Sequence, residues 1–279
     1  MNTATTPGRY RRPRGLSLIA LLFGMALCFA PSRADAEAVD TELLLLVDVS
    51  NGGLKKGEFE LLMDGYAAAM TSSQVIDAIQ SGSVGRIAVS LVYFGGTPVQ
   101  PTGGAWMSIG GLAEAQSFAA QLQALPEPGG GNFNYDESLG YAVSAFGTET
   151  GGATTNGFES AVQIIEVAGA SRPKGNSAVV DAATASAFAA GVDLIGATAI
   201  GKKADQIESY YATHVVGGEV GGVTGTVSTH DLGAGLELTL ANRIGTGVTG
   251  GATVVPEPSP GFLILSSLGV LFLFIRRRA

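Results

Sequence analysis

The sequence is poor in cysteine and histidine: its 279 residues contain one Cys, Cys28, and two His. A single Cys excludes a disulfide framework and a cysteine-based zinc site, and two His argue against a His-rich metal enzyme. Glycine is abundant, with 41 residues, but it follows no three-residue repeat, so a collagen-like chain is excluded. Hydrophobic residues make up 46% of the chain, which excludes global disorder.

Positive charge is scarce in the middle of the chain. Residues 37–255 hold 8 Lys and Arg against 22 Asp and Glu, a balance of −14. Because such an acidic segment repels phosphate backbones, the charge argues against nucleic acid as a partner. The remaining Arg residues lie near the two ends, five within 1–36 and three within 256–279. Both clusters flank apolar runs, which is typical of membrane targeting.

A signal peptide is predicted for residues 1–36. Arginines at the start precede an apolar run over 16–30, and Ala34 and Ala36 then supply the small residues of a cleavage site. We expect cleavage after Ala36, which would leave a mature chain without cysteine. An uncleaved signal anchor is the alternative.

Residues 256–279 form the second predicted targeting segment. It contains a Pro-Glu-Pro motif, an apolar run and an arginine cluster, in this order: Pro256, Glu257, Pro258, residues 261–275, Arg276, Arg277 and Arg278. A helix over 261–275 would be about 22 Å long, so flanking residues or a thinner bilayer must cover the rest of a hydrocarbon core of about 30 Å. We predict a transmembrane segment with cytoplasmic arginines and the acidic domain outside. The Gly- and Thr-rich residues 246–255 are predicted to be a flexible tether.

The three parts of this tail resemble the PEP-CTERM sorting signal of Gram-negative bacteria. The resemblance implies that an exosortase processes the tail near the Pro-Glu-Pro motif, and many carriers come from exopolysaccharide-producing strains. It also implies export across the inner membrane, anchoring at first, and then a place on the cell surface or in the extracellular matrix. A plain C-terminal anchor is the alternative.

The middle of the chain alternates between two periodicities. Strands are predicted over 41–47, 87–94, 161–167 and 192–200, and helices over 58–71, 112–125, 135–146, 179–190, 204–212 and 232–244. Strands separated by helices imply parallel pairing through right-handed crossovers. We therefore predict an α/β fold in which residues 37–245 form one domain around a doubly wound, mostly parallel sheet.

Two polar residues follow the first predicted strand directly. Asp48 comes at its end and Ser50 two residues later. In an open parallel sheet, ligands bind beyond the carboxyl ends of the strands, and Mg²⁺ prefers such oxygen ligands. The alternative is that both side chains only shape the turn through local hydrogen bonds.

The stretch from Asp48 to Gly52 resembles a bacterial family of von Willebrand factor type A-like proteins of unknown function, as do residues 58–59, 65–69, 75–76, 85–89, 207–211 and 215–218. The resemblance implies a Rossmann-like fold. Such domains typically carry a metal-ion-dependent adhesion site made of Asp-x-Ser-x-Ser, a distant Thr and a distant Asp.

This chain departs from that adhesion-site pattern. Asp48 and Ser50 match it, but Gly52 replaces the second Ser. Asn132 stands in the place of the Thr, and Ala170 in the place of the Asp. The resemblance therefore implies a degenerate site of Asp48, Ser50 and Asn132, which would bind Mg²⁺ weakly at most, and no other cofactor.

Three further features carry less information. Residues 245–250 satisfy G-x-G-x-x-G but follow a predicted helix, whereas a dinucleotide-binding loop follows a strand. His214 and His230 could join Asp231 in a hydrolase triad, but no G-x-S-x-G motif presents a nucleophile, and His214 is interpreted as a polar neighbour of two tyrosines. Trp106 is interpreted as a core anchor, with an exposed contact residue as the alternative.

Taken together, these features favour an exported, membrane-sorted, non-enzymatic binding or adhesion module. Its partner would be a protein or an extracellular polymer, held near Asp48, Asn132 and Ala170. A hydrolase acting on envelope or matrix material is one alternative, and a structural component of the extracellular matrix is another.

Overall fold

The computed structural model describes residues 36–54, 57–95, 105–147, 156–171, 177–201, 203–230 and 235–250. The strands are β1 (Glu37–Ala38), β2 (Thr41–Asp48), β3 (Ile87–Phe94), β4 (Met107–Ile109), β5 (Phe158–Glu159), β6 (Gln163–Gly169), β7 (Leu194–Ile200), β8 (Gly217–Val220), β9 (Val223–Thr224) and β10 (Val227–His230). The helices are α2 (Glu58–Met70), α3 (Ser73–Gln80), α4 (Leu112–Gln123), α5 (Tyr135–Phe146), α6 (Ser177–Ala189), α7 (Ala204–His214) and α8 (Leu236–Val248).

The main sheet has the strand order β4-β3-β2-β6-β7-β8-β9, and β10 also pairs with β7. The pairs β2–β3, β2–β6, β6–β7 and β7–β10 are parallel, whereas β4, β8 and β9 pair antiparallel at the margins. A short parallel pair of β1 and β5 stands beside it. The predicted α/β fold with a doubly wound, mostly parallel sheet is confirmed.

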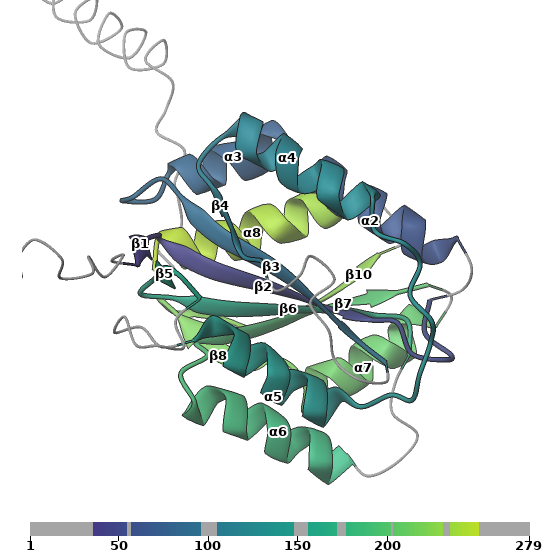
Figure 1. Ribbon diagram of the computed structural model, residues 1–279. Helices are drawn as coiled ribbons and strands as arrows, with labels where there is room; N and C mark the ends of the chain where they lie inside the picture. Colours follow the sequence, from purple (N-terminus) through teal and green to yellow (C-terminus); the bar gives the residue numbers. More distant parts are fainter. Residues whose placement is uncertain are drawn as a thin grey trace, which may run out of the picture. The chain divides into compact units, whose positions relative to one another are not determined.

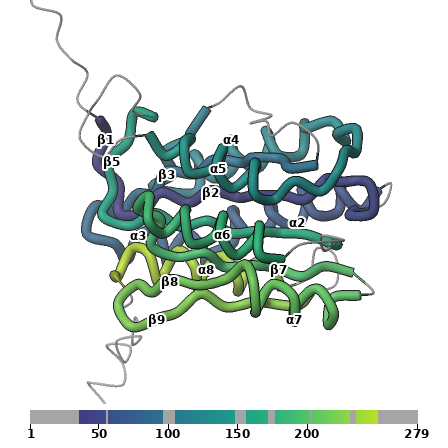
Figure 2. The backbone as a smooth tube through the Cα atoms, turned by 90° about the horizontal axis from the view of Figure 1, so that it is seen from below, coloured from purple at the N-terminus to yellow at the C-terminus, as the bar shows by residue number. Residues whose placement is uncertain are grey.

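Helices cover both faces of the sheet, which is why its central strands are apolar throughout. Successive side chains of a strand point to opposite faces, so Leu43 and Leu45 enter one core cluster and Leu44 and Leu46 the other. The first cluster packs under α2, α3, α4 and α8, above the sheet in Figure 1, and the second packs against α5, α6 and α7 below it. Figure 2, seen from below, has these three helices nearest to the viewer.

The strand order creates a switch point beside β2. From β2 the chain passes through α2 and α3 to β3 on one side, whereas the later strand β6 pairs with the other side of β2. In open α/β sheets, ligands bind outside the carboxyl ends of the strands at such a point. The residues that follow β2 and β6 are therefore the first place to look for a site.

The predicted central strands and the helices between them are all present, with bounds close to those predicted. Helix α3 was not predicted, because only two residues separate it from α2; Ser72 caps it by accepting a hydrogen bond from the N–H of Val75 at 3.2 Å. The Gly-rich stretch over 217–225 contains two short strands, β8 and β9. Glycine is needed there because a Cβ at Gly218 would lie 2.8 Å from the ring of Phe188.

The predicted tether over 246–255 is wrong at its start, because α8 continues to Val248. A Cβ at Gly247 would lie 2.7 Å from Cγ2 of Thr41, so a glycine lets the last turn of α8 approach the beginning of β2. Val248 is buried as well. The small residues that suggested flexibility are therefore the ones that allow close packing.

The two predicted targeting segments lie almost wholly outside the described residues. Of the signal peptide only Ala36 is described, and nothing of the sorting tail over 256–279 is. Within the described ranges, no helix combines the length and apolar composition that crossing a membrane requires.

Candidate functional site

Asp48, Ser50 and Ser171 meet at the carboxyl edge of the sheet, where the neighbouring strands β2 and β6 end. The N–H of Ser50 donates to Oδ1 of Asp48 at 2.9 Å. The hydroxyl of Ser171 donates to Oδ2 of Asp48, and the hydroxyl oxygens of Ser50 and Ser171 are 3.2 Å apart. Both oxygens of the Asp48 carboxylate therefore accept hydrogen bonds from within the site.

Glycines give these polar groups the room to approach one another. A Cβ at Gly169 would lie 3.0 Å from Cβ of Asp48 and closer still to the hydroxyl of Tyr211. Gly95 has a φ of 135°, which favours glycine, and a Cβ there would lie 2.5 Å from the backbone nitrogen of Ser50. The ends of β3 and β6 are thus shaped around the loop after β2.

Burial sets the electrostatics of this group. Asp48 is 0% exposed, and loss of water raises the pKa of its carboxyl; hydrogen bonds from Ser171 and Ser50 only partly offset that rise. Burial also raises the pKa of Tyr211 well above its usual value, with a further contribution from the charge of Asp48. The hydroxyl of Tyr211 donates to the backbone oxygen of Ser171 at 3.3 Å, so Tyr211 holds the loop after β6 in place.

The other two residues predicted to lie at the site, Asn132 and Ala170, have different surroundings from each other. Asn132 is exposed, in a loop that reaches the site through its backbone: the oxygen of Gly131 accepts the N–H of Asn51 at 2.8 Å. Ala170 packs against the first core cluster, and it is Ser171, one position later, that meets Asp48. Ser171 was not predicted; its signal in the sequence was a hydroxyl residue two positions after a strand.

The donor set does not fit a tight Mg²⁺ site. One carboxylate and two hydroxyls converge, so water would have to supply the remaining oxygen ligands of a six-coordinate ion. Among the residues that the structure describes, no group of three or more His, Cys, Asp or Glu is placed to hold a metal ion.

The histidines lie in other environments. Nδ1 of His214 is 2.7 Å from Oδ1 of Asp181, and its ring packs on that of Tyr210 with centroids 4.7 Å apart, which confirms its interpretation as a polar neighbour of tyrosine. His230 contacts the hydroxyl of Thr239 at 2.8 Å. Burial lowers the pKa of His230, while the charge of Glu166 opposes that change.

Trp106 is confirmed as a core anchor. Its indole N–H donates to the backbone oxygen of Ala145 at 2.9 Å. Its ring packs on that of Phe146 with centroids 5.4 Å apart, at the margin of the second core cluster.

A buried ion pair between β6 and α8 was not predicted. Nε of Arg243 is 2.7 Å from Oε2 of Glu166, whose other oxygen accepts the hydroxyl of Thr198 at 2.8 Å. The guanidinium also donates to the backbone oxygen of Thr226 at 2.6 Å. This pair fixes α8 to the sheet away from the carboxyl edge, so its role is structural.

Comparison with known proteins gives one match over most of the domain. The model of the family described as "Protein of unknown function (DUF1194)" matches residues 38–243. No protein of curated function matches the chain.

Several solved structures give matches of low identity over most of this chain. The chain is similar to the pilus adhesin SpaC from Lactobacillus rhamnosus GG, with 11% identity, a TM-score of 0.45 and coverage of 77% of this chain and 31% of that one. A von Willebrand factor type A structure from Catenulispora acidiphila gives 13% identity, a TM-score of 0.42, and coverage of 75% and 43%. Proximal thread matrix protein 1 from the mussel byssus, with a zinc-occupied MIDAS motif, gives 15% identity and a TM-score of 0.45, with coverage of 76% of this chain and 48% of that one. The chain spans at most about half of the length of these chains. At these TM-scores the similarity carries no inference about a ligand.

Proposed function

The chain belongs to the DUF1194 family of proteins of unknown function, and from that premise we propose that it is an exported, non-enzymatic binding module of von Willebrand factor type A-like design. Its partner is a protein or an extracellular polymer, and it docks at the carboxyl edge of the sheet. Metal contributes little or nothing to this binding, because one carboxylate and two hydroxyls are too few ligands for tight Mg²⁺ binding.

The observation that supports this proposal most directly is the hydrogen bonding among four loops at that edge, which follow β2, β3 and β6 and precede α5. Ser50 meets Ser171, the N–H of Asn51 donates to the oxygen of Gly131, and the N–H of Gly95 donates to Oδ1 of Asn134 at 3.2 Å. We call these loop residues, together with the exposed Asn132, the loop platform. A surface held in place before binding loses less conformational entropy when a partner docks.

The position of the loop platform suits a tethered module. The last turn of α8 meets the beginning of β2, so the described domain begins and ends at the amino edge of the sheet. The platform lies at the opposite edge. If the termini carry the signal peptide and an exosortase-processed tail, as their sequences predict, the platform faces away from the point of attachment.

The contacts of the histidines favour binding over hydrolysis. A serine hydrolase needs a base within hydrogen-bond reach of its nucleophile. His214 pairs with Asp181 and His230 with Thr239, so the rings that could act as a base are engaged elsewhere than at Ser50 and Ser171.

Retention of the purified chain on extracellular material from the producing strain tests the proposal. Asn132→Trp blocks the loop platform and should abolish retention, whereas Gln74→Trp, on the exposed face of α3, should not. Equal retention of both variants would place binding elsewhere. Labelling of Ser50 or Ser171 by a serine-directed covalent probe would instead support the hydrolase.

Thermal melts test whether the native protein binds a metal ion. Ligands that bind only the native state raise the melting midpoint. We expect no shift with Mg²⁺, Mn²⁺ or EDTA, and a clear rise with millimolar metal would restore the adhesion-site mechanism.

A further inference from the structure

The chain contains two Asn-Gly pairs, Asn51-Gly52 and Asn156-Gly157, and the structure describes both of them. The side-chain amide of an Asn can be attacked by the backbone nitrogen of the next residue. This reaction is fastest when that residue is glycine, which has no side chain to obstruct the approach. Because the two pairs have the same intrinsic chemistry, their surroundings decide how readily each of them reacts.

The Asn51-Gly52 pair lies at the tip of the loop after β2. The N–H of Gly53 donates to the backbone oxygen of Ser50 at 2.9 Å, so Asn51 and Gly52 are the two central residues of a β-turn. Both residues are exposed, and Gly52 has a φ of 127°, which favours glycine. Since the hydrogen bond of the turn joins the two flanking residues, the peptide group between Asn51 and Gly52 can rotate without breaking it.

The reacting atoms of this pair are accessible. In the described part of the chain, no hydrogen bond engages the side chain of Asn51 or the N–H of Gly52. The side chain of Asn51 lies against Gly130, where a Cβ would come 3.0 Å from its Cγ, so a glycine leaves room beside the amide. The nitrogen of Gly52 can therefore approach Cγ of Asn51 without the loss of a hydrogen bond by either group.

The side chain of Asn156, by contrast, is held at both of its polar atoms. Its Nδ2 donates to Oε1 of Glu42, and its Oδ1 accepts the N–H of Phe158 at 2.8 Å. Asn156 is half-buried, and the backbone oxygen of Gly157 accepts the N–H of Glu37 at 2.8 Å, which ties this turn to β1. Two side-chain hydrogen bonds must therefore break before Asn156 can react.

We propose that Asn51 is a site of spontaneous deamidation and that the fold protects Asn156. The nitrogen of Gly52 forms a bond to Cγ of Asn51, the bond between Cγ and Nδ2 breaks, and ammonia leaves with the proton of the Gly52 N–H. Water then opens the resulting succinimide ring at either of its carbonyl carbons, which gives an aspartate or an isoaspartate at position 51. The reaction needs no partner, so it is independent of the binding function proposed above.

Either product changes the loop platform in a measurable way. A carboxylate replaces the neutral amide, so each converted chain gains one negative charge. Isoaspartate also inserts one additional carbon atom into the backbone, directly after the residue whose N–H donates to the oxygen of Gly131. Converted chains should therefore separate as a more acidic form on ion exchange, and those with isoaspartate should accept a methyl group from an isoaspartate methyltransferase.

Peptide mapping by mass spectrometry of the full chain, kept native at physiological temperature and mildly alkaline pH, tests the proposal. Because two hydrogen bonds restrain Asn156, one of them to a carboxyl group, Asn51 should convert at least about tenfold faster. In concentrated urea, where the fold is lost, the two rates should become similar. Equal rates in the native chain would overturn the proposal. The same ratio in urea as in the native chain would also overturn it, because neighbouring residue types rather than the fold would then decide.

Two matched substitutions assign the change in charge. Asn51→Gln keeps an amide, but its reaction requires a larger ring that closes far more slowly, so the native chain should no longer accumulate the acidic form. Asn156→Gln is the control and should accumulate that form at the wild-type rate. An acidic form that appears in Asn51→Gln as fast as in the wild type would refute the assignment to Asn51.

Discussion

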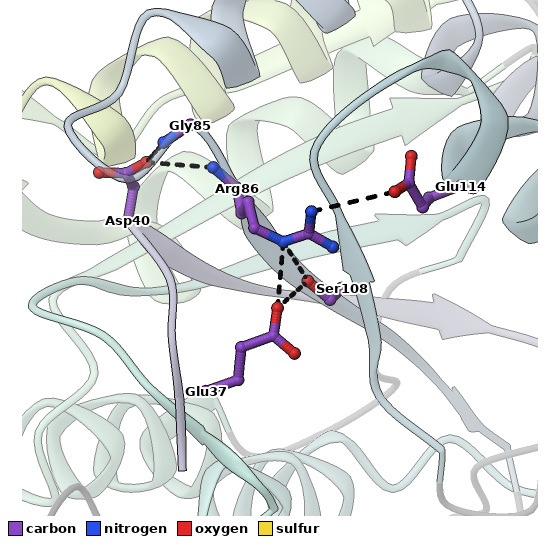
Figure 3. A network of polar contacts seen from close by, with 6 residues as sticks. All are labelled: Glu37, Asp40, Gly85, Arg86, Ser108 and Glu114. Carbon is purple, nitrogen blue, oxygen red and sulfur yellow. Dashed lines mark hydrogen bonds and ion pairs between the residues drawn. The ribbon is translucent and has the colours of Figure 1, made fainter. Parts of the chain in front are cut away.

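Replacing Asp40 by Asn should destabilise the domain more than its position before a strand suggests. The carboxylate accepts hydrogen bonds from the hydroxyl of Ser83 at 2.9 Å and from the N–H groups of Val84, Gly85 and Arg86, the shortest at 2.7 Å. It thereby ties the turn before β3 to the start of β2 (Figure 3). Asn keeps one acceptor oxygen but turns an N–H₂ group toward backbone N–H donors.

The expected loss follows from these contacts. A hydrogen bond to a charged group contributes about 1.5–3 kcal/mol, and contributions within one cluster do not add fully. We therefore expect a loss of about 3 kcal/mol in the free energy of unfolding, which for a domain of this size lowers the melting temperature by roughly 6–12 °C. No cavity contributes, because Asn has the same shape as Asp.

The pH dependence provides the sharper test. Burial by itself would raise the pKa of Asp40, but the hydrogen bonds from Val84, Ser83, Gly85 and Arg86 outweigh it and lower the pKa below its usual 3.8. A lowered native pKa stabilises the fold above the unfolded-state value, and the effect is lost as the pH falls through the native value. The difference between wild type and Asp40→Asn should therefore be full at about pH 6 and should shrink steadily below about pH 4.

Urea denaturation of both chains across this pH range measures the difference. Asp77→Asn, which changes an exposed carboxylate on α3, is the matched control and should stay within about 0.5 kcal/mol of wild type. A difference for Asp40→Asn that is no larger than for Asp77→Asn, or that does not shrink in acid, would refute this account of the turn.

Two further substitutions test the packing of polar groups. Gly169→Ala should cost about 1–3 kcal/mol in urea denaturation, because the added methyl group meets Tyr211 and Asp48; an unchanged midpoint would show that the site is loose. Arg243→Met should cost about 3–5 kcal/mol by leaving Glu166 buried without its cation, and the double variant with Glu166→Met should recover at least half of that loss. If the double variant is as unstable as Arg243→Met alone, the penalty does not come from the unpaired charge.

The core strands and helices could be predicted because their signals are local. The run Leu43–Val47 and the spacing of Phe59, Leu62 and Met63 in α2 each report burial within a few residues of sequence. β8 and β10 gave no such signal, because they are short and only partly buried. Their place in the sheet depends on backbone pairing with β7, and the hydropathy of the sequence carries no information on that pairing.

The candidate site could be predicted only in part, for the same reason. Asp48 and Ser50 stand out because they follow a strand directly. Ser171 comes to them from a position 123 residues beyond Asp48, and only the pairing of β2 with β6 brings it there. The contact of Gly131 could not be foreseen either, because it is made through a backbone oxygen, which every residue type has.

The buried ion pair did leave a sequence signal of a kind that is easy to overlook. Glu166 interrupts the apolar strand β6, and Gly196 stands directly beside it in β7. A Cβ at Gly196 would lie 2.5 Å from both Oε2 of Glu166 and Cζ of Arg243, so the glycine provides the space for the pair. Because a charged residue in a fully covered strand needs both a counter-ion and room, an interior Glu predicts a basic residue in a covering helix and a small residue in a neighbouring strand. Since Arg86 pairs with Glu37 outside the core, Arg243 in α8 is the cation that meets this condition among the described residues. Glu166 and Gly196 together thus determine where α8 packs on the sheet, because Arg243 must reach the space beside them.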